Sequence, residues 1–342
     1  MNIVLILGNG FSIDFISKIE RGGSIDLSNL FKNGDKVPWP ANDIPGFLSQ
    51  KYCPELWNLG VRPNISKEKS KKIIEDIITC ANVSATIEEM SVNVEPENIY
   101  VRAYHELVAY LRYLFIYYNN IVEDSDIENR IKKWGWSNLF KNIWNNDRIE
   151  NVVIITYNYD VFLERILKIM KIEFQVEGVE ENKECKFKII KPHGSISFRS
   201  RNLNDKDIFS IKYARGQSAG ALDDLELDDN INNDKISSIN TMIPPAGESK
   251  RYPYLWSKVL REMALTRVKE CGIGDDVIIG GISYCSVDRA EIDEIITSMD
   301  KNVNVSIINP DVDNTFDAVI SSVFEKYIHY TEVDTIGGLY ND

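Results

Sequence analysis

The chain has 342 residues, of which 44% are hydrophobic and 10% aromatic, enough to form the core of one large α/β domain with an insertion, or of two domains. Its formal net charge of −13 argues against unaided binding to nucleic acid, which requires a basic surface. A small anionic ligand is not excluded, because backbone N–H groups and helix N-termini bind phosphate without Lys or Arg.

Cysteine usage and hydropathy predict the compartment. The five cysteines form no C-x-x-C pair, which favours a reduced, cytoplasmic chain without a zinc site. Residues 1–8 are apolar but too short for a signal peptide, and no apolar run approaches the roughly 20 residues of a membrane span. We therefore expect a cytoplasmic protein that needs no metal and does not contact a membrane.

The first predicted strand, residues 2–7, runs into G-N-G-F-S at residues 8–12 and a predicted helix at 13–19. Strand, glycine turn and helix is the arrangement of a dinucleotide phosphate site, where glycines allow close approach of the backbone. The third glycine of G-x-G-x-x-G is absent, so an ordinary tight turn is the alternative. The phosphate interpretation assigns four residues of this turn to the pyrophosphate: Gly8, Asn9, Gly10 and Ser12.

A mostly helical insertion is predicted at residues 31–149. Residues 21–60 are rich in Gly, Pro, Asn and Asp and are expected to be irregular, whereas residues 66–144 have helical patterning. Within residues 97–122, large apolar side chains recur at helical spacing: Tyr104, Leu107, Val108, Leu111, Leu114, Phe115 and Tyr118. Such a stripe is typical of core packing, and the alternative is an oligomer interface.

Two later strands are predicted to end in polar residues. The apolar, β-branched run at 152–155 reads as a strand buried on both faces of a parallel sheet, and Thr156, Asn158 and Asp160 follow it. A second apolar run at 187–190 leads into K-P-H-G at 191–194. Ligands of open α/β sheets bind at the carboxyl ends of strands, so both ends are expected to meet at one nucleotide.

Residues 200–240 are dominated by Asp, Asn, Ser, Gly and Lys and are predicted to form an acidic mobile surface loop or lid. Five acidic residues there predict a solvated face rather than a metal site: Asp223, Asp224, Glu226, Asp228 and Asp229.

Alternation of helices and strands then resumes. The predicted elements are a helix at 256–270, a strand at 277–281, a helix ending at Met299, a last strand at 303–308 and a closing helix at 316–327. Asp288 with Glu291 resembles a capping box at the start of the third of these. The alternation indicates an α/β doubly wound sheet, formed by residues 1–30 and 150–342.

Four motifs, in this order, resemble the sirtuin-like NAD-binding family. They are G-N-G-F-S at 8–12, T-Y-N-Y-D at 156–160, K-P-H-G at 191–194 and G-x-S with Asp288 downstream at 281–288. Asn309, at the end of the last predicted strand, fits a fifth. The resemblance implies a Rossmann-like parallel sheet that binds NAD as substrate, with the large helical insertion between the first and second sheet strands. Its remaining nucleotide contacts are Thr156, Gly194, Gly281, Ser283, Asp288 and Asn309.

The chain departs from protein-deacylating sirtuins in lacking two cysteine pairs for zinc and in having the helical insertion. Both departures resemble the bacterial anti-phage branch, which hydrolyses NAD to nicotinamide and ADP-ribose. Because 342 residues leave no room for a fused sensor module, the chain looks most like the stand-alone partner of a HerA-type ATPase. The resemblance also implies a homo-oligomer.

Cleavage of the nicotinamide–ribose bond leaves an oxocarbenium-like centre, so an enzyme must hold the ribose, stabilise that charge and present water. Asn158 suits the positioning of water, because its amide both accepts and donates, and helix capping is the alternative. His193 is the predicted general base, with a structural histidine as the alternative. Asp160 is predicted to act electrostatically beside the ribose or nicotinamide, and capping is equally compatible.

The other assignments have local alternatives too. Gly194 permits close approach of the ribose or simply a turn, Ser283 contacts phosphate or the adenosine ribose, and Asp288 serves NAD or a helix cap. Asn309 is predicted to hydrogen-bond the adenosine ribose, and its alternative is a turn before Pro310.

Three activities fit these residues. The first is an NAD glycohydrolase that depletes NAD in abortive infection under the control of oligomerisation or a partner ATPase. The second is an NAD-dependent protein deacylase, which needs a groove for an acyl-lysine peptide. The third is a non-catalytic subunit that binds NAD or ADP-ribose and regulates assembly. Fold alone does not decide among them.

Overall fold

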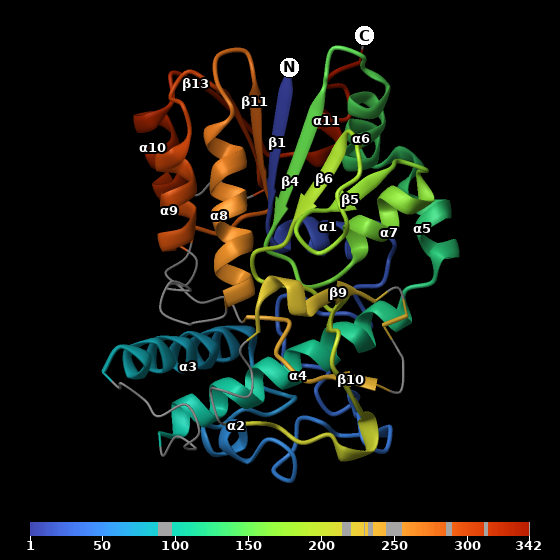
Figure 1. Ribbon diagram of the computed structural model, residues 1–342, viewed down its shortest axis with the longest axis vertical. Coiled ribbons are helices and arrows are strands. Elements are labelled where there is room, and N and C mark those ends of the chain that lie inside the picture. The colour runs from blue at the N-terminus through green and yellow to red at the C-terminus, as the bar shows by residue number, and fades with distance from the viewer. Residues whose placement is uncertain are drawn as a thin grey trace.

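A parallel sheet of seven strands forms the centre of the computed structural model, in the order β13-β12-β11-β1-β4-β6-β5 (Figure 1). The strands are β1 (Asn2–Leu7), β4 (Asn151–Thr156), β5 (Phe174–Val176), β6 (Phe187–Ile190), β11 (Asp276–Gly280), β12 (Asn304–Ile308) and β13 (Lys326–Tyr330). The structure describes residues 1–87, 98–213, 220–228, 230–231, 235–243, 255–284, 289–310 and 314–341.

Strand β1 is the middle of the sheet. Leu5 pairs with Ile154 of β4 on one side and with Ile278 of β11 on the other, and all three side chains are fully buried. β-branched and large apolar residues fit a pleated surface that is covered on both faces. The chain order reverses at β1, so the carboxyl ends of β1, β4 and β11 flank the crevice where open α/β sheets bind ligands.

Helices cover both faces of the sheet. Figure 1 shows α8 in front of it and α1 and α11 behind it. The helices outside the insertion are α1 (Asn9–Lys18), α7 (Phe162–Ile169), α8 (Leu255–Lys269), α9 (Arg289–Ser298), α10 (Asn314–Val323) and α11 (Val333–Ile336). This is the predicted Rossmann-like α/β architecture. Within the described residues, no helix combines the length and apolar character that crossing a membrane requires.

The segment between β1 and β4 is mostly helical, as predicted. It contains α2 (Pro54–Asn58), α3 (Lys67–Ile87), α4 (Ile99–Ile121), α5 (Asp124–Arg130), the 3-10 helix η1 (Ile131–Lys133), α6 (Gly135–Asn145) and a small hairpin of β2 (Pro38–Trp39) and β3 (Ile44–Pro45). Figure 1 shows α3 and α4 below the carboxyl ends of the sheet strands.

The apolar stripe of α4 belongs to the core of this chain. Tyr104, Leu107, Leu114 and Tyr118 are fully buried, and Phe115 is 4% exposed. These side chains therefore pack in the core, and an oligomer interface would have to be formed by other residues.

Residues 200–240 are not a structureless loop where they are described. Strands β7 (Phe198–Ser200) and β9 (Leu225–Leu227) pair antiparallel, as do β8 (Leu203–Asp205) and β10 (Lys235–Ser237). Two short 3-10 helices, η2 (Lys206–Ile208) and η4 (Leu222–Asp224), connect them. Leu225 of β9 is buried in the core, so the described part of this segment has secondary structure and a buried apolar side chain. Its mobility and its role as a lid stay predictions.

The acidic run is only partly a solvated face. Asp223 and Asp224 are exposed, whereas Asp228 is buried and ion-paired with Arg199. Asp229 lies outside the described residues.

The end of the chain differs from its prediction. The expected closing helix at 316–327 is a shorter helix, α10, followed by the additional strand β13, which pairs in parallel with β12. Residues 303–308 therefore do not form the last strand. The register sets His329 of β13 beside Ile307 of β12.

Candidate active site

Asn158 and His193 line one cavity of about 1440 Å³ at the carboxyl ends of the strands. Asn158 follows β4 and His193 follows β6, and these strands are neighbours in parallel register. The cavity extends past the glycine turn to Ser283 and Asn309. Since pockets for drug-sized ligands are about 300–1,000 Å³, this cavity has room for a dinucleotide.

The amide of Asn158 is fixed by the glycine turn. Its Nδ2 donates to the carbonyl of Gly8 (2.9 Å) and to Oγ of Ser12 (3.0 Å), and its backbone N–H donates to Oγ1 of Thr156 (3.2 Å). Both amide hydrogens are therefore engaged. Oδ1 remains as the acceptor for a water or a ribose hydroxyl, so the expectation that the amide also donates to substrate is corrected.

Ser12 and Asp160 form a chain of hydrogen bonds that holds the side chain of Asn158. Ser12 is fully buried, and its hydroxyl donates to Oδ2 of Asp160 (2.8 Å) while it accepts from Asn158. Oδ1 of Asp160 accepts from the backbone N–H of Phe162 (3.1 Å) at the start of α7. Both oxygens of Asp160 thus make structural hydrogen bonds, which gives the capping alternative a geometric basis.

A buried lysine lies beside Asp160. Nζ of Lys191 donates to the carbonyl of Asp160 (2.6 Å) and forms an ion pair with Glu164 (2.7 Å). Burial raises the pKa of Asp160, and the positive charge of Lys191 and the hydrogen bond from Ser12 offset only part of that effect.

His193 is paired with a carboxylate that the sequence did not single out for catalysis. Its Nε2 lies 2.6 Å from Oε2 of Glu291, and both side chains are buried at the cavity wall. The ring of Tyr157 lies against the imidazole at 4.8 Å between centroids. A carboxylate in this position orients the ring and stabilises an imidazolium.

Glu291 comes from α9, far from His193 in the chain. One feature of the sequence could have identified Glu291 as a buried carboxylate. It is a charged residue on a helix face whose other members, Ile292, Ile295 and Ile296, are apolar and buried. The sequence analysis assigned it only to a capping box with Asp288, which lies outside the described residues.

The loop after β6 requires glycine for packing. Gly194 has a φ of +82°, and a Cβ built there would lie 2.0 Å from the carbonyl oxygen of Thr241. Thr241 also accepts from the backbone N–H of Ser195 (3.2 Å). The space beside Gly194 is therefore filled by protein, which favours the turn interpretation over close approach of a ribose.

The glycine turn after β1 makes contact with another strand end. The N–H groups of Gly8 and Gly10 donate to the carbonyls of Gly280 (3.0 Å) and Gly281 (2.8 Å). A Cβ on Gly10 would lie 2.5 Å from Cα of Gly281. Glycine is thus required here for the approach of β1 to β11, and these two N–H groups are not directed at a phosphate.

The predicted nucleotide contacts divide into two groups. Gly8, Asn9, Gly10, Gly281, Ser283 and Asn309 line the cavity with Asn158, Asp160 and His193. Ser12, Thr156 and Gly194 are not among the residues that line the cavity, and Ser12 is fully buried. A direct contact of Ser12 with pyrophosphate stays a prediction that this geometry does not favour. The side chains of Asn9 and Asn309 brace the wall by donating to the carbonyls of Leu27 (2.9 Å) and Ile282 (3.1 Å), respectively.

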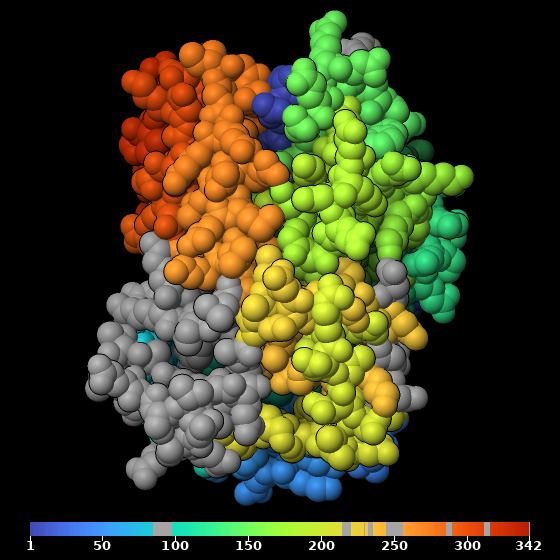
Figure 2. Space-filling view, viewed as in Figure 1, coloured from blue at the N-terminus to red at the C-terminus, as the bar shows by residue number. Residues whose placement is uncertain are grey.

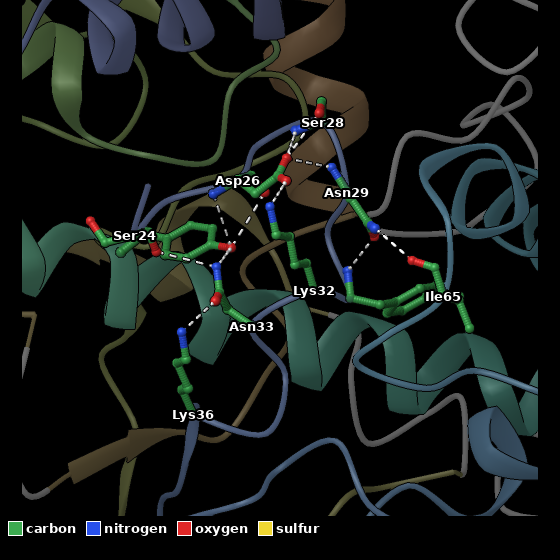
Figure 3. A network of polar contacts seen from close by, with 10 residues as sticks. Ser24, Asp26, Ser28, Asn29, Lys32, Asn33, Lys36 and Ile65 are labelled. Carbon is green, nitrogen blue, oxygen red and sulfur yellow. Dashed lines mark hydrogen bonds and ion pairs between the residues drawn. The ribbon is translucent and has the colours of Figure 1, made fainter. Parts of the chain in front are cut away.

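The loop after α1 closes one side of the cavity and is held by a polar network (Figure 3). Asp26 accepts from the hydroxyl of Ser28 (2.8 Å), the backbone N–H of Asn29 (2.9 Å) and Nζ of Lys32 (3.0 Å). Burial raises the pKa of Asp26, but these hydrogen bonds outweigh it and hold the pKa below its ordinary value. The loop contributes Leu27, Ser28 and Leu30 to the cavity wall.

Among the residues that the structure describes, no group of three or more His, Cys, Asp or Glu side chains is arranged to hold a metal ion. The groups in the cavity wall include an amide acceptor, an imidazole and carboxylates.

Residues 152–229 match the family described as the SIR2-like domain. The match includes Thr156–Asp160 and 191–194, the two strand ends that meet in the cavity. No curated protein matches the chain. SIR2-like domains use NAD and are in general NAD-dependent enzymes. The match therefore supports a sirtuin-like family for this chain and an NAD-related activity.

Proposed function

We propose that the chain is an NAD glycohydrolase, which cleaves NAD to nicotinamide and ADP-ribose. The observation that supports the proposal most is the meeting of Asn158, His193 and Glu291 in one cavity long enough to continue to Asn309. Hydrolysis needs an acceptor that orients water and a base that takes its proton. Oδ1 of Asn158 is such an acceptor, and His193 with Glu291 is such a base. This reaction does not require an acyl-lysine substrate.

In the proposed reaction, Oδ1 of Asn158 orients a water molecule toward C1′ of the nicotinamide ribose. A C–O bond forms as the C1′–N bond breaks, and the electron pair of the broken bond leaves with the ring as neutral nicotinamide. The water proton passes to His193, and the carboxylate of Glu291 stabilises the resulting imidazolium.

We further propose that this activity belongs to anti-phage defence and depends on assembly with further copies of the chain and with a HerA-type ATPase. The helical insertion and the residues that follow the His-Gly motif support this proposal. Strands β7 to β10 follow the His-Gly motif in the chain, and the described cysteines Cys53, Cys80, Cys185 and Cys271 form no disulfide with one another.

The test measures nicotinamide and ADP-ribose by chromatography after incubation of NAD with the chain, alone and with a co-encoded ATPase. We expect Asn158→Ala and His193→Ala each to lower nicotinamide release by about 10²–10⁴-fold, because each removes a group that acts on the water. Asn182→Ala, in an exposed position, is the control and should retain full activity.

Other products would assign another activity. Acetyl-ADP-ribose formed only with an acetylated peptide would identify a deacylase. Tight binding of NAD without consumption in the assembled complex would identify a regulatory subunit. Full nicotinamide release by both alanine variants would refute the roles of Asn158 and His193.

A further inference from the structure

A second cavity, of about 200 Å³, lies between α4 and the small sheets of residues 198–237. Figure 1 shows β10 beside α4, below the main sheet, and in Figure 2 the yellow segment with β7 to β10 forms this part of the surface. The charged residues lining it are Arg112, Arg199, Lys206, Lys235, Asp43 and Asp228. Four cations and two carboxylates therefore line this wall, and carboxylates next to the cavity pair with some of the cations.

Three of the four cations already have carboxylate partners. Arg199 pairs with Glu226 (2.7 Å), Lys206 pairs with Asp43 (2.8 Å), and Lys235 pairs with Asp205. These pairs fix the positions of the cations around the cavity.

Arg112 differs from the other three. No carboxylate of the described residues lies within ion-pairing distance of its guanidinium. Its Nη1 donates to Oγ1 of Thr241 (2.5 Å) and to the carbonyl of Ser195 (3.4 Å). Burial lowers the pKa of Arg112, and the charge of Asp228 offsets only part of that effect. Arg112 is half-buried at the cavity wall, and an anion placed against the remaining N–H donors of such a guanidinium stabilises it.

We propose that this second cavity binds a small molecule through a phosphate group. The planar guanidinium of Arg112 offers the two-pronged donor geometry that phosphate accepts, and the ammonium groups of Lys206 and Lys235 are further donors in the cavity wall. Tyr117 and Pro38 supply an apolar wall for the rest of the molecule. This site is separate from the cavity of Asn158 and His193, since the two share no described residue.

The position of Arg112 connects this site to the loop of His193. Nη1 of Arg112 donates hydrogen bonds to Thr241 and Ser195. The backbone of Thr241 packs against Gly194, the residue that follows His193 in the chain. An anion that draws the guanidinium toward the cavity would alter these contacts. Any effect on nicotinamide release rests on the proposed function, whereas binding itself does not.

Isothermal titration calorimetry on the full chain tests the proposal with two probes, inorganic phosphate and ribose 5-phosphate, in chloride buffer. We expect saturable binding to the wild type, weakened about tenfold or more by Arg112→Gln and severalfold by Lys206→Gln, because each loses a charge-assisted contact. Tighter binding of ribose 5-phosphate than of phosphate would identify an organic phosphate as the ligand class, and equal binding would identify the phosphate group alone.

Lys258→Gln is the matched control, since Lys258 belongs to an exposed ion pair with Glu262 on α8 and lines neither cavity. Absence of saturable binding of both probes to the wild type up to about 10 mM would overturn the proposal. Unchanged binding in Lys206→Gln, a residue whose ammonium donates to Asp43, would overturn it even if Arg112→Gln failed to fold.

Discussion

The pairing of His193 with Glu291 is the contact with the clearest chemical meaning at the residue scale. The two groups are 2.6 Å apart and almost fully buried, so their interaction is little screened by water. The second oxygen of Glu291 lies 3.9 Å from Arg261, which holds the carboxylate in place. Glu291 is thus a positioning residue, which acts on substrate through His193.

Replacement of Glu291 tests this role. We expect Glu291→Gln to lower kcat for nicotinamide release by about 10–100-fold with a smaller change in KM, since the neutral amide orients the ring but does not stabilise its charged form. For the same reason, the acid limb of the pH–rate profile should move to lower pH.

The control for this variant is Glu262→Gln, at an exposed position of α8. Steady-state kinetics across the pH range provide the measurement. An unchanged profile with an unchanged kcat would show that Glu291 serves only the packing of α9.

Gly194 illustrates how a loop conformation is restricted to one residue type. Gly194→Ala should lower the free energy of unfolding by about 3 kcal/mol or more, because it combines a positive φ with a clash against Thr241. Gly274 has a similar φ of +91° with open space around it, so Gly274→Ala should cost only about 1 kcal/mol. Urea denaturation followed by circular dichroism measures both, and equal losses would contradict the packing argument.

At the scale of elements, the edge strand β13 stabilises the turn after β12. Nδ1 of His329 lies 2.8 Å from Asp317 of α10, and Nε2 lies 2.9 Å from the carbonyl of Asn309. Only the imidazolium donates from both nitrogens. Burial lowers the pKa of His329, but these two hydrogen bonds outweigh it, and the pKa lies above its ordinary value.

This raised pKa predicts a pH-dependent stability. The contribution is complete below the unfolded pKa, about 6.5, and is lost as the pH rises through the higher folded pKa. His329→Gln should therefore cost about 1–2 kcal/mol near pH 5.5 and clearly less near pH 8.5. Tyr327→Gln, on the same strand and exposed, should show a loss independent of pH in the same denaturation experiment. A difference for His329→Gln that grows with pH would contradict the assignment.

At the scale of the whole molecule, the sequence was a good guide wherever a strand is buried on both faces. Such strands are continuous apolar runs, and β1 and β6 begin and end at the predicted residues. Strand β13 lies at the edge, and Lys326 and Tyr327 are exposed. This strand lacks a continuous apolar run, so the sequence does not distinguish its start from the end of the predicted helix at 316–327.

The candidate site was predictable to the same extent. Asn158 and His193 follow buried strands in recognisable motifs, and the parallel sheet brings such ends together. Glu291 was not predictable as the partner of His193, because the approach of α9 is set by tertiary packing rather than by local sequence. The burial of Ser12 behind Asn158 also depends on how α1 packs against the loop after β4.

The central place of β1 has a consequence for biosynthesis. The register joins Asn2 to Asn151 and Ile3 to Asp276, so β1 is synthesised before both of its partner strands and must wait for them. Contacts so distant in sequence slow folding and leave apolar edges open in the meantime. Nascent chains of this protein should therefore depend on chaperones until β11 emerges, and the cavity of Asn158 and His193, which needs both β4 and β11, cannot assemble on a truncated product.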